Sequence, residues 1–329
     1  MHMADALVSP AVAGTAYVAA AALAVYSIRK VREEKDPKRI PLMGIMGAFV
    51  FAAQMLNFTI PGTGSSGHFC GSLLLAALLG PYAGFLTMIG ILTVQCLLFA
   101  DGGILALGCN IWNMAFYGCF VSGLLLWRPV MRTGFSKQKI LWTAVLGAII
   151  SLQLGALSVV VETLLSGITE LPFSVFAVAM QGIHLLIGLV EGVITASVLL
   201  FIYEARPELL AGGLQENAGR FGLVQTLTAL AGVTVLCAGG LSLAASEKPD
   251  GLEWSLEKVL GTAELAGDGY WYTVAEKLQE ATAILPDYGF SGSESIWGTV
   301  VSGIFGSLVV ALLCVGCCYA LRLFKDKMA

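Results

Sequence analysis

Long apolar runs, separated by short polar or glycine-rich stretches, make up most of this 329-residue chain. A helix needs about 20 predominantly apolar residues to cross the hydrocarbon core of a membrane. The runs predict nine spanning helices, at 10–28, 42–58, 69–80, 82–100, 104–127, 140–162, 177–203, 223–245 and 297–321. The pattern therefore indicates an all-α polytopic membrane protein.

Composition agrees with this interpretation. Hydrophobic residues make up 57% of the chain and charged residues only 12%, whereas soluble domains carry about 25% charged residues. The eight cysteines almost all fall in apolar segments. They are typical of small buried hydrophobic residues rather than of a zinc site or a disulfide framework.

Charge gives the predicted orientation of the spans. The segment 69–80 is short for a span, with about 18 Å of helix at 1.5 Å per residue. With it counted, fifteen of the eighteen Lys and Arg residues fall on one side, leaving Lys248, Lys258 and Lys277 opposite. Basic loops favour the cytoplasm. We therefore expect a plasma-membrane protein of a prokaryote with its N-terminus outside and its C-terminus in the cytoplasm.

The spans fall into two parts. Residues 1–203 form a predicted seven-span unit, 204–222 a polar cytoplasmic linker, and 223–329 a unit of two spans around an outer loop at 246–296. That loop holds ten acidic residues and three lysines. The acidic residues could concentrate cations outside the membrane or simply keep the loop soluble. Apolar spacing at 253–260 and 272–284 predicts helices within it.

The candidate chemistry begins at the first residues, Met1-His2-Met3. The terminal amine, the His2 amide nitrogen and the His2 imidazole can close two chelate rings around one metal ion. With the amide deprotonated, the three nitrogens approach the planar arrangement that Ni(II) and Cu(II) favour. This chelator requires an unprocessed N-terminus, and the stretch 1–9 lacks the basic residues of a cleavable signal peptide. A cloning scar is the alternative explanation of Met-His.

A fourth nitrogen has two possible sources, His68 and His184. His68 ends the segment 60–68, in which four of nine residues are Gly or Pro, so the backbone turns tightly and can aim a side chain. The predicted topology places this loop on the same side as Met1, and we expect His68 to be a metal ligand. The alternative is that His68 caps a helix or forms a hydrogen bond with a loop carbonyl. The loop also spells GxGxxG, but no strand is predicted before it, so a dinucleotide site is excluded by context.

Further polar residues occur near the predicted site. Asp5 could orient an imidazole or sit at a helix start. Asp101, Asn110 and Asn113 could shape the metal pocket or tie helices together through amide hydrogen bonds.

His184 and Glu191 lie two turns apart on one face of the seventh span. Ionisable groups inside a membrane suggest function, but a structural polar lock is the preferred interpretation. Glu191 lies too deep to share a site with Met1. Gly44, Ala48 and Ala52 form a stripe for close helix packing, either inside the protein or against another subunit.

No GxxxxGK[ST] phosphate loop, HExxH or GxSxG motif is present. We therefore expect neither ATP hydrolysis through a phosphate loop nor the activity of an intramembrane hydrolase.

Several segments resemble one known family. Met-His at the start, FTIPGTGSSGH at 58–68, ADGGILALGCNIWNMAFYG at 100–118 and GIHLLIGLVEGVIT at 182–195 are similar to the CbiM/NikM substrate-capture (S) components of energy-coupling factor transporters for nickel and cobalt. KPDGLEWSLEKV at 248–259 resembles the small NikN/CbiN partner with its PDGLE signature.

The resemblance implies a seven-helix metal-capture unit fused to its accessory partner. It implies that Met1, His2 and His68 hold the ion through the amine, the amide and imidazole nitrogens of His2, and the His68 imidazole. It also implies a transmembrane coupling (T) subunit and cytoplasmic ATPase subunits as partners. The expected cargo is Ni(II), with Co(II) second, and no organic cofactor. A self-sufficient secondary transporter using Glu191 as a proton-linked carboxylate is the rival hypothesis, and a metal sensor is a weaker one.

Overall fold

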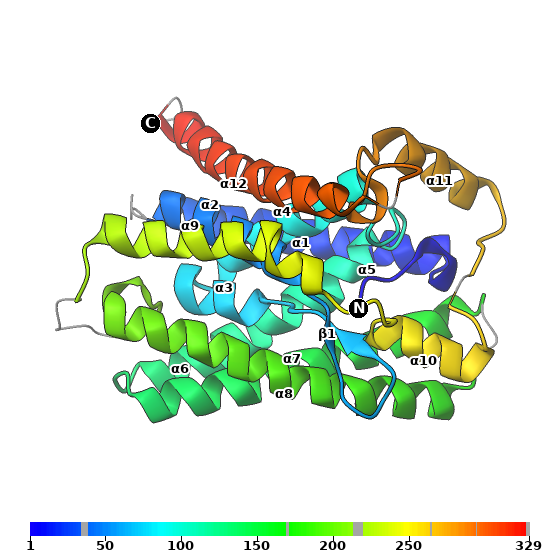
Figure 1. The fold of residues 1–329 in the computed structure, drawn as a ribbon, viewed down its shortest axis with the longest axis horizontal. Coiled ribbons are helices and arrows are strands. Elements are labelled where there is room, and N and C mark those ends of the chain that lie inside the picture. Colours follow the sequence, from blue (N-terminus) through cyan, green and yellow to red (C-terminus); the bar gives the residue numbers. More distant parts are fainter. Residues whose placement is uncertain (34–38, 169–170, 213–219, 264, 294, 327–329) are drawn as a thin grey trace.

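The computed structural model describes residues 1–33, 39–168, 171–212, 220–263, 265–293 and 295–326. The protein is a bundle of long helices whose axes run roughly along its longest dimension (Figure 1). The N-terminus lies at the same end of the bundle as α10 and α11, the helices of the predicted outer loop.

The first half contains the predicted first five spans. Its elements are η1 Asp5–Leu7, α1 Pro10–Glu33, α2 Arg39–Gln54, β1 Phe58–Thr59, β2 Ser66–Gly67, α3 Ser72–Leu79, α4 Pro81–Phe99, α5 Leu107–Ile111, η2 Trp112–Trp127 and α6 Arg128–Met131. The segment η2 has the wide turns of a π-helix. It follows α5 and leads into α6, so that the three form one continuous helix.

The second half contains two long helices, a connecting segment and the PDGLE region. Its elements are α7 Lys137–Ser166, α8 Phe173–Ala205, η3 Pro207–Leu209, α9 Leu223–Gly239, η4 Leu241–Ala244, α10 Gly251–Leu260, α11 Tyr270–Thr282, η5 Pro286–Tyr288 and α12 Ile296–Asp326. Helices α10 and α11 confirm the two helices predicted for the loop at 246–296.

Each predicted span coincides with a helix, so the all-α membrane fold is confirmed. Among the described residues, six helices are long and apolar enough to cross a membrane, and α2 and α9 are shorter apolar helices. The doubtful segment 69–80 holds α3, only eight residues long and buried throughout. It ends at Gly80, whose φ of 83° breaks the helix before Pro81 opens α4. The number of crossings stays a prediction.

Three local expectations are corrected. The GxGxxG loop does follow a strand, because β1 and β2 pair antiparallel, with Phe58 opposite Gly67. This two-residue ladder is a hairpin, not the strand–turn–helix unit of a dinucleotide site. Helix α8 runs to Ala205, past the predicted boundary at 203, and α9 ends at Gly239 rather than 245. Residues 213–219 of the predicted linker lie outside the described residues.

The stripe of small residues on α2 packs inside the protein. A Cβ atom at Gly44 would lie 2.8 Å from Val315 Cγ2, and one at Gly47 would lie 3.2 Å from Cys314 Sγ. Both neighbours belong to α12. The absence of a side chain at Gly44 and at Gly47 therefore lets α12 approach α2 closely. This contact joins the predicted unit 223–329 to the predicted unit 1–203.

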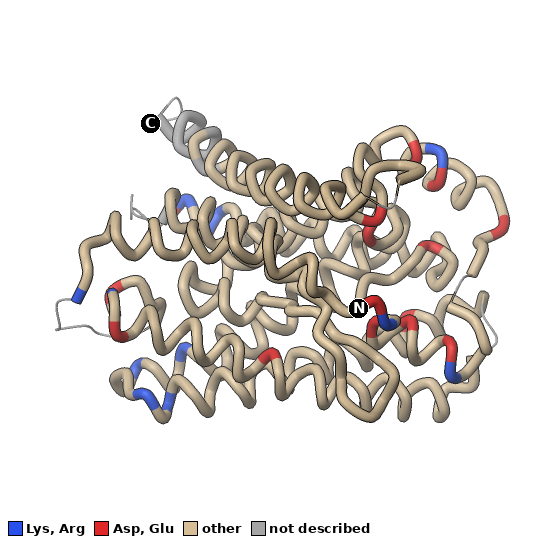
Figure 2. Tube along the Cα trace, in the orientation of Figure 1, with Lys and Arg blue, Asp and Glu red and all other residues tan. Residues whose placement is uncertain are grey.

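Charge separates the two ends of the bundle (Figure 2). Lys and Arg gather at the end where α6 lies, whereas Asp and Glu predominate at the end that holds the N-terminus, α10 and α11. This separation agrees with the predicted clustering of basic loops on one side. Lys35, Lys38 and Lys327 of that cluster lie outside the described residues.

Candidate metal site

The first three residues are held inside the protein as an extended segment. Asn110 brackets the Met3 peptide, because its Oδ1 accepts from Met3 N at 2.7 Å and its Nδ2 donates to Met3 O at 3.1 Å. Gly103 N also donates to Met3 O at 2.9 Å. Met1 and Met3 as whole residues are 4% and 0% exposed. The tip of the chain is thereby fixed by apolar burial and by three hydrogen bonds.

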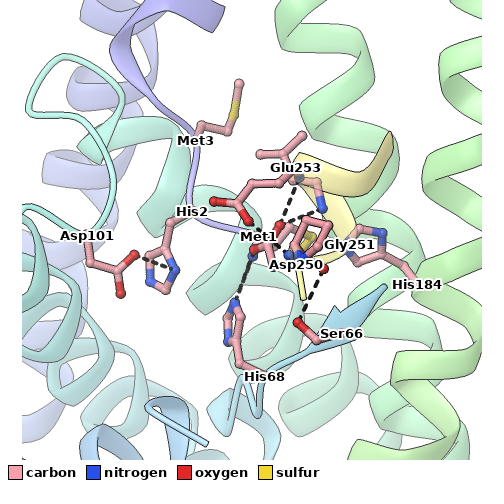
Figure 3. Close-up of polar contacts among 12 residues, drawn as sticks. Met1, His2, Met3, Ser66, His68, Asp101, His184, Asp250, Gly251 and Glu253 are labelled. Carbon is pink, nitrogen blue, oxygen red and sulfur yellow. Dashed lines mark hydrogen bonds and ion pairs between the residues drawn. The ribbon is translucent and has the colours of Figure 1, made fainter. Parts of the chain in front are cut away.

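The hairpin before α3 brings His68 to the terminal amine. Gly62 and Gly64 have φ values of 79° and 83°, which favour glycine over other residues, and they turn the chain between β1 and β2. His68 follows β2, and its Nε2 lies 2.7 Å from Met1 N (Figure 3). Its Nδ1 lies 3.2 Å from Phe69 O. A carbonyl only accepts, so Nδ1 carries the ring proton and the Nε2 lone pair faces the amine.

The separation of these two nitrogens suits neighbouring corners of a metal site. Two nitrogens at right angles, each about 2.0 Å from an ion, lie about 2.8 Å apart. The observed distance between Met1 N and His68 Nε2 is 2.7 Å. An ion could therefore bind both atoms with little movement of either.

A chain of amides determines which nitrogen of His2 is free. Gln54 Nε2 donates to the backbone oxygen of Cys70 at 2.7 Å, so Gln54 Oε1 faces Gln95 and accepts from its Nε2 at 2.7 Å. Gln95 Oε1 is then left to face His2 Nε2, at 3.2 Å. Since this oxygen can only accept, His2 Nε2 carries the proton and Nδ1 is free. Nδ1 is the nitrogen that closes a six-membered ring with the His2 amide.

The free Nδ1 of His2 faces a carboxylate. It lies 3.2 Å from Asp101 Oδ1, while Asp101 Oδ2 accepts from the Tyr288 hydroxyl at 2.5 Å. With a neutral imidazole, two lone-pair atoms face each other here, which a cation on Nδ1 would relieve. The His2 and His68 rings stack with centroids 5.1 Å apart (Figure 3).

Asp250, at the start of α10, supplies a carboxylate to the terminal amine. Its Oδ2 accepts from Met1 N at 2.6 Å, and the two side chains are 15% and 3% exposed. A charge-assisted hydrogen bond of this kind contributes about 1.5–3 kcal/mol. Burial alone raises the pKa of Asp250, but the adjacent ammonium and His68 outweigh it and hold that pKa well below its usual range.

Both imidazoles are biased toward the neutral form. Burial lowers the pKa of His2, although the nearby Asp101 opposes this shift. Burial, followed by the positive terminal amine and His2, lowers the pKa of His68 well below its usual value. Only an unprotonated imidazole nitrogen binds a metal, so both rings suit that role at neutral pH.

A cavity of about 1010 Å³ opens beside His2 and His68. It is bounded by the first unit on one side and by residues of the loop at 246–296 on the other. Among the described residues, its lining includes no Lys or Arg and seven carboxylates, those of Asp5, Asp101, Glu247, Asp250, Glu253, Glu276 and Asp287. The negative lining favours the approach of cations.

Two predicted accessory residues have roles other than orienting an imidazole. Asp5 Oδ1 accepts from Ala106 N at 3.0 Å. It thus stabilises the start of α5, which agrees with the second of the two roles considered for it, a carboxylate at a helix start. Asn113 Nδ2 donates to Glu162 Oε2 at 2.7 Å and lies 3.4 Å from Met3 Sδ. Asn110 and Asn113 therefore fix the tip, whereas Asp101 is the residue that contacts His2.

His184 and Glu191 do not pair with each other. The Glu191 carboxylate accepts from Cys70 N at 2.9 Å and Gly71 N at 3.1 Å, just before α3. His184 Nδ1 lies 2.8 Å from Met180 O in its own helix. Each side chain has its own structural partner, and neither contacts the terminal amine or His2.

Among the described residues, no group of three or more His, Cys, Asp or Glu side chains is arranged to hold a metal ion. The candidate site differs because two of its four nitrogens belong to the main chain. Sequence reasoning missed Gln54, Gln95 and Asp250 as members of its surroundings. Buried amides in apolar spans, and an Asp before the helix predicted at 253–260, were the available signals.

Comparisons with known proteins agree with the fold and the sequence motifs. The family described as "Cobalt uptake substrate-specific transmembrane region" (CbiM) matches residues 2–209, and the PDGLE domain matches 224–323. A putative fused nickel transport protein NikMN of Archaeoglobus fulgidus is 37% identical over 95% of this chain and 96% of its own length. A probable fused nickel transport protein LarMN of Lactiplantibacillus plantarum is 31% identical over 96% and 97%.

A solved structure has a similar fold. The crystal structure of a truncated transition metal transporter is 33% identical, with a TM-score of 0.55, and covers 62% of this chain and 99% of that one. Fold and matches together define a multi-pass helical membrane protein of metal uptake. The chain belongs to the CbiM family and carries a fused PDGLE domain.

Proposed function

We propose that this protein is the metal-capture subunit of an ATP-driven energy-coupling factor importer, with Ni(II) as its cargo and Co(II) as second choice. The ion binds to four nitrogens: the Met1 amine, the His2 amide nitrogen, His2 Nδ1 and His68 Nε2. Residues 1–203 form the capture unit and 223–329 the accessory unit. The N-terminus faces the outside of the cell, and a T subunit and cytoplasmic ATPase subunits complete the importer.

One observation carries the proposal: the 2.7 Å contact between Met1 N and the unprotonated Nε2 of His68. The amide chain that leaves His2 Nδ1 free supports it. A planar set of four nitrogens favours Ni(II) over Co(II) on geometric grounds. The names of the nickel transport relatives point to the same cargo.

Titration calorimetry with Ni(II) and Co(II) on protein with a free amine at Met1 tests the proposal. We expect tight binding of Ni(II), weaker binding of Co(II), and loss of tight binding in His2→Ala. Acetylating the Met1 amine should also remove tight binding, because the blocked nitrogen can no longer bind the ion. If the acetylated protein binds Ni(II) normally, the four-nitrogen site is wrong.

Transport by the chain alone separates the importer from the secondary transporter. Glu191 is committed to two backbone amides, which favours a structural role over proton coupling. We expect no Ni(II) uptake into ATP-free vesicles that contain only this chain. Uptake there would support the secondary transporter instead.

A further inference from the structure

The start of α10, in the PDGLE segment, contacts both parts of the candidate site. This segment lies about 180 residues after His68 in the sequence, yet it touches the terminal amine and the loop that carries His68. The segment itself supplies none of the four proposed nitrogens. Asp250 and its neighbours could instead position the groups that carry the four nitrogens.

The Asp250 carboxylate divides its oxygens between two tasks. Oδ1 accepts from Leu252 N at 2.7 Å and Glu253 N at 2.9 Å, which caps α10. Glu253 Oε2 accepts in return from Asp250 N at 2.9 Å, completing a capping box. The cap fixes the carboxylate, so Oδ2 is held in position to accept from Met1 N at 2.6 Å.

The same segment also fixes the loop before His68. Ser66 N donates to Pro249 O at 2.8 Å and Ser66 Oγ to Lys248 O at 2.7 Å. Trp254 Nε1 donates to Thr63 O at 3.0 Å. One short stretch of chain therefore sets the positions of both the amine and the hairpin that presents His68 (Figure 3).

The segment is seated firmly against α8. A Cβ atom at Gly251 would lie 3.0 Å from His184 Cε1, 3.1 Å from His184 Nε2 and 2.8 Å from Ile187 Cδ1. The lack of a side chain at Gly251 thus permits close packing of α10 on α8. Residue 250 is therefore attached to the rigid bundle rather than to a mobile loop.

We propose that Asp250 is a positioning residue for metal capture, holding the terminal amine next to His68 before the ion arrives. The proposal rests on the proposed four-nitrogen site. Once the ion is bound, the coordinated amine still carries N–H groups that Oδ2 can accept. A divalent ion with one deprotonated amide has a net charge of +1, which the carboxylate balances within a buried site. The accessory unit thus supplies a group in direct contact with the site of the capture unit.

Asp250→Asn tests the contact while preserving the cap, since Asn caps helices as well as Asp does. Glu253→Gln is the matched control: it also removes one carboxylate from the cavity lining and can still accept from Asp250 N. The first readout is Ni(II) affinity by calorimetry. We expect a loss of roughly 10–100-fold in Asp250→Asn, the usual cost of losing an outer partner of a ligand, and a change of about twofold or less in Glu253→Gln.

The second readout needs no metal. An amine-acylating reagent is applied to the metal-free protein, and labelling of the N-terminal peptide is followed by mass spectrometry. We expect slow labelling of Met1 in the wild type and in Glu253→Gln, and clearly faster labelling in Asp250→Asn. Asp250→Ser, which caps α10 but is too short to reach the amine, should behave like Asp250→Asn.

Several outcomes overturn the proposal. Equal affinity losses in Asp250→Asn and Glu253→Gln would assign the effect to the overall charge of the cavity. Unchanged affinity or unchanged labelling in Asp250→Asn would remove Asp250 from this role. Failure of the wild type to bind Ni(II) would instead overturn the proposed function, whereas the labelling result would still report on the contact itself.

Discussion

The loop that carries His68 and the helix face that carries His184 hold similar imidazoles with different surroundings. His184 is 2% exposed and the His68 side chain is 10% exposed, and both rings place Nδ1 against a backbone carbonyl, of Phe69 and of Met180. Each therefore has an unprotonated Nε2. His68 Nε2 faces the terminal amine and borders the acidic cavity, whereas His184 Nε2 faces the backbone of Gly251.

The difference shows that burial and tautomer do not by themselves make a ligand. What matters is what the free nitrogen faces. A hairpin with left-handed glycines can present a ring toward other donors, while a ring on a packed helix face serves as a surface for another helix. On this basis we propose that His184 belongs to the surface on which α10 packs and not to the metal site.

Replacing each histidine by glutamine gives the largest expected contrast. His68→Gln should abolish tight Ni(II) binding, a loss beyond the roughly 100-fold seen for outer partners. His184→Gln should lose no more than about 100-fold in Ni(II) affinity, because it leaves all four nitrogens in place. Calorimetry on both variants checks this. Strong loss in His184→Gln with intact binding in His68→Gln would reverse the assignment.

Acid should weaken binding through the main-chain nitrogens rather than through the imidazoles. Burial, first of all, lowers the pKa of both His2 and His68, so these rings are already unprotonated and release no proton to the metal near neutral pH. The His2 amide nitrogen binds the ion only after it loses its proton, so affinity should fall at least tenfold per pH unit as pH decreases. Calorimetry from pH 8 to 6 measures the slope. An affinity that does not change with pH would show that the amide does not bind.

The amide chain behind His2 should have an intermediate effect. Gln95→Leu removes the acceptor for His2 Nε2 and leaves Gln54 Oε1 without its donor, so Ni(II) affinity should fall about 10–100-fold. Gln153, whose side chain bonds the backbone of Gln181 between α7 and α8, offers a control amide away from the site. Gln153→Leu should leave the affinity unchanged in the same titration. Equal effects of the two would indicate general loosening of the bundle.

The smallest expected effect concerns the packing of α10 on α8. Gly251→Ala would press a methyl group against His184 and Ile187, and overpacking of this kind costs about 1–3 kcal/mol. Gly182, on the same helix as His184, has open space around it, so Gly182→Ala should not destabilise the protein. Thermal unfolding in detergent compares the two. If Gly251→Ala unfolds like the wild type, the packing of α10 on α8 is looser than described.

Local sequence was enough to predict the helices and the two main candidate histidines. Apolar run length predicted the spans, and the glycine-rich loop and the Met-His start singled out His68 and His2. Asp250 was not predicted because its contact with Met1 joins residues 249 positions apart, a distance that only the folded chain closes.

Gln54 and Gln95 were missed for a different reason. Helix α4 is apolar on nearly every face and largely buried. Its sequence therefore does not distinguish an inner from an outer face, and the direction of Gln95 could not be predicted. The sequence left two roles open for Asp5 because a carboxylate near His2 in sequence need not be near it in space: Asp101, far along the chain, contacts the His2 ring.

The contact between Met1 and Asp250 also has a consequence for how the protein is made. Met1 meets its carboxylate partner only after Asp250, 249 residues later in the chain, has been synthesised and inserted. Until then the opening tripeptide can be ordered only by its neighbours in the first unit. The candidate metal site around Met1 is therefore among the last regions of the molecule to form. A protein truncated before α10 would lack the Asp250 contact at this site.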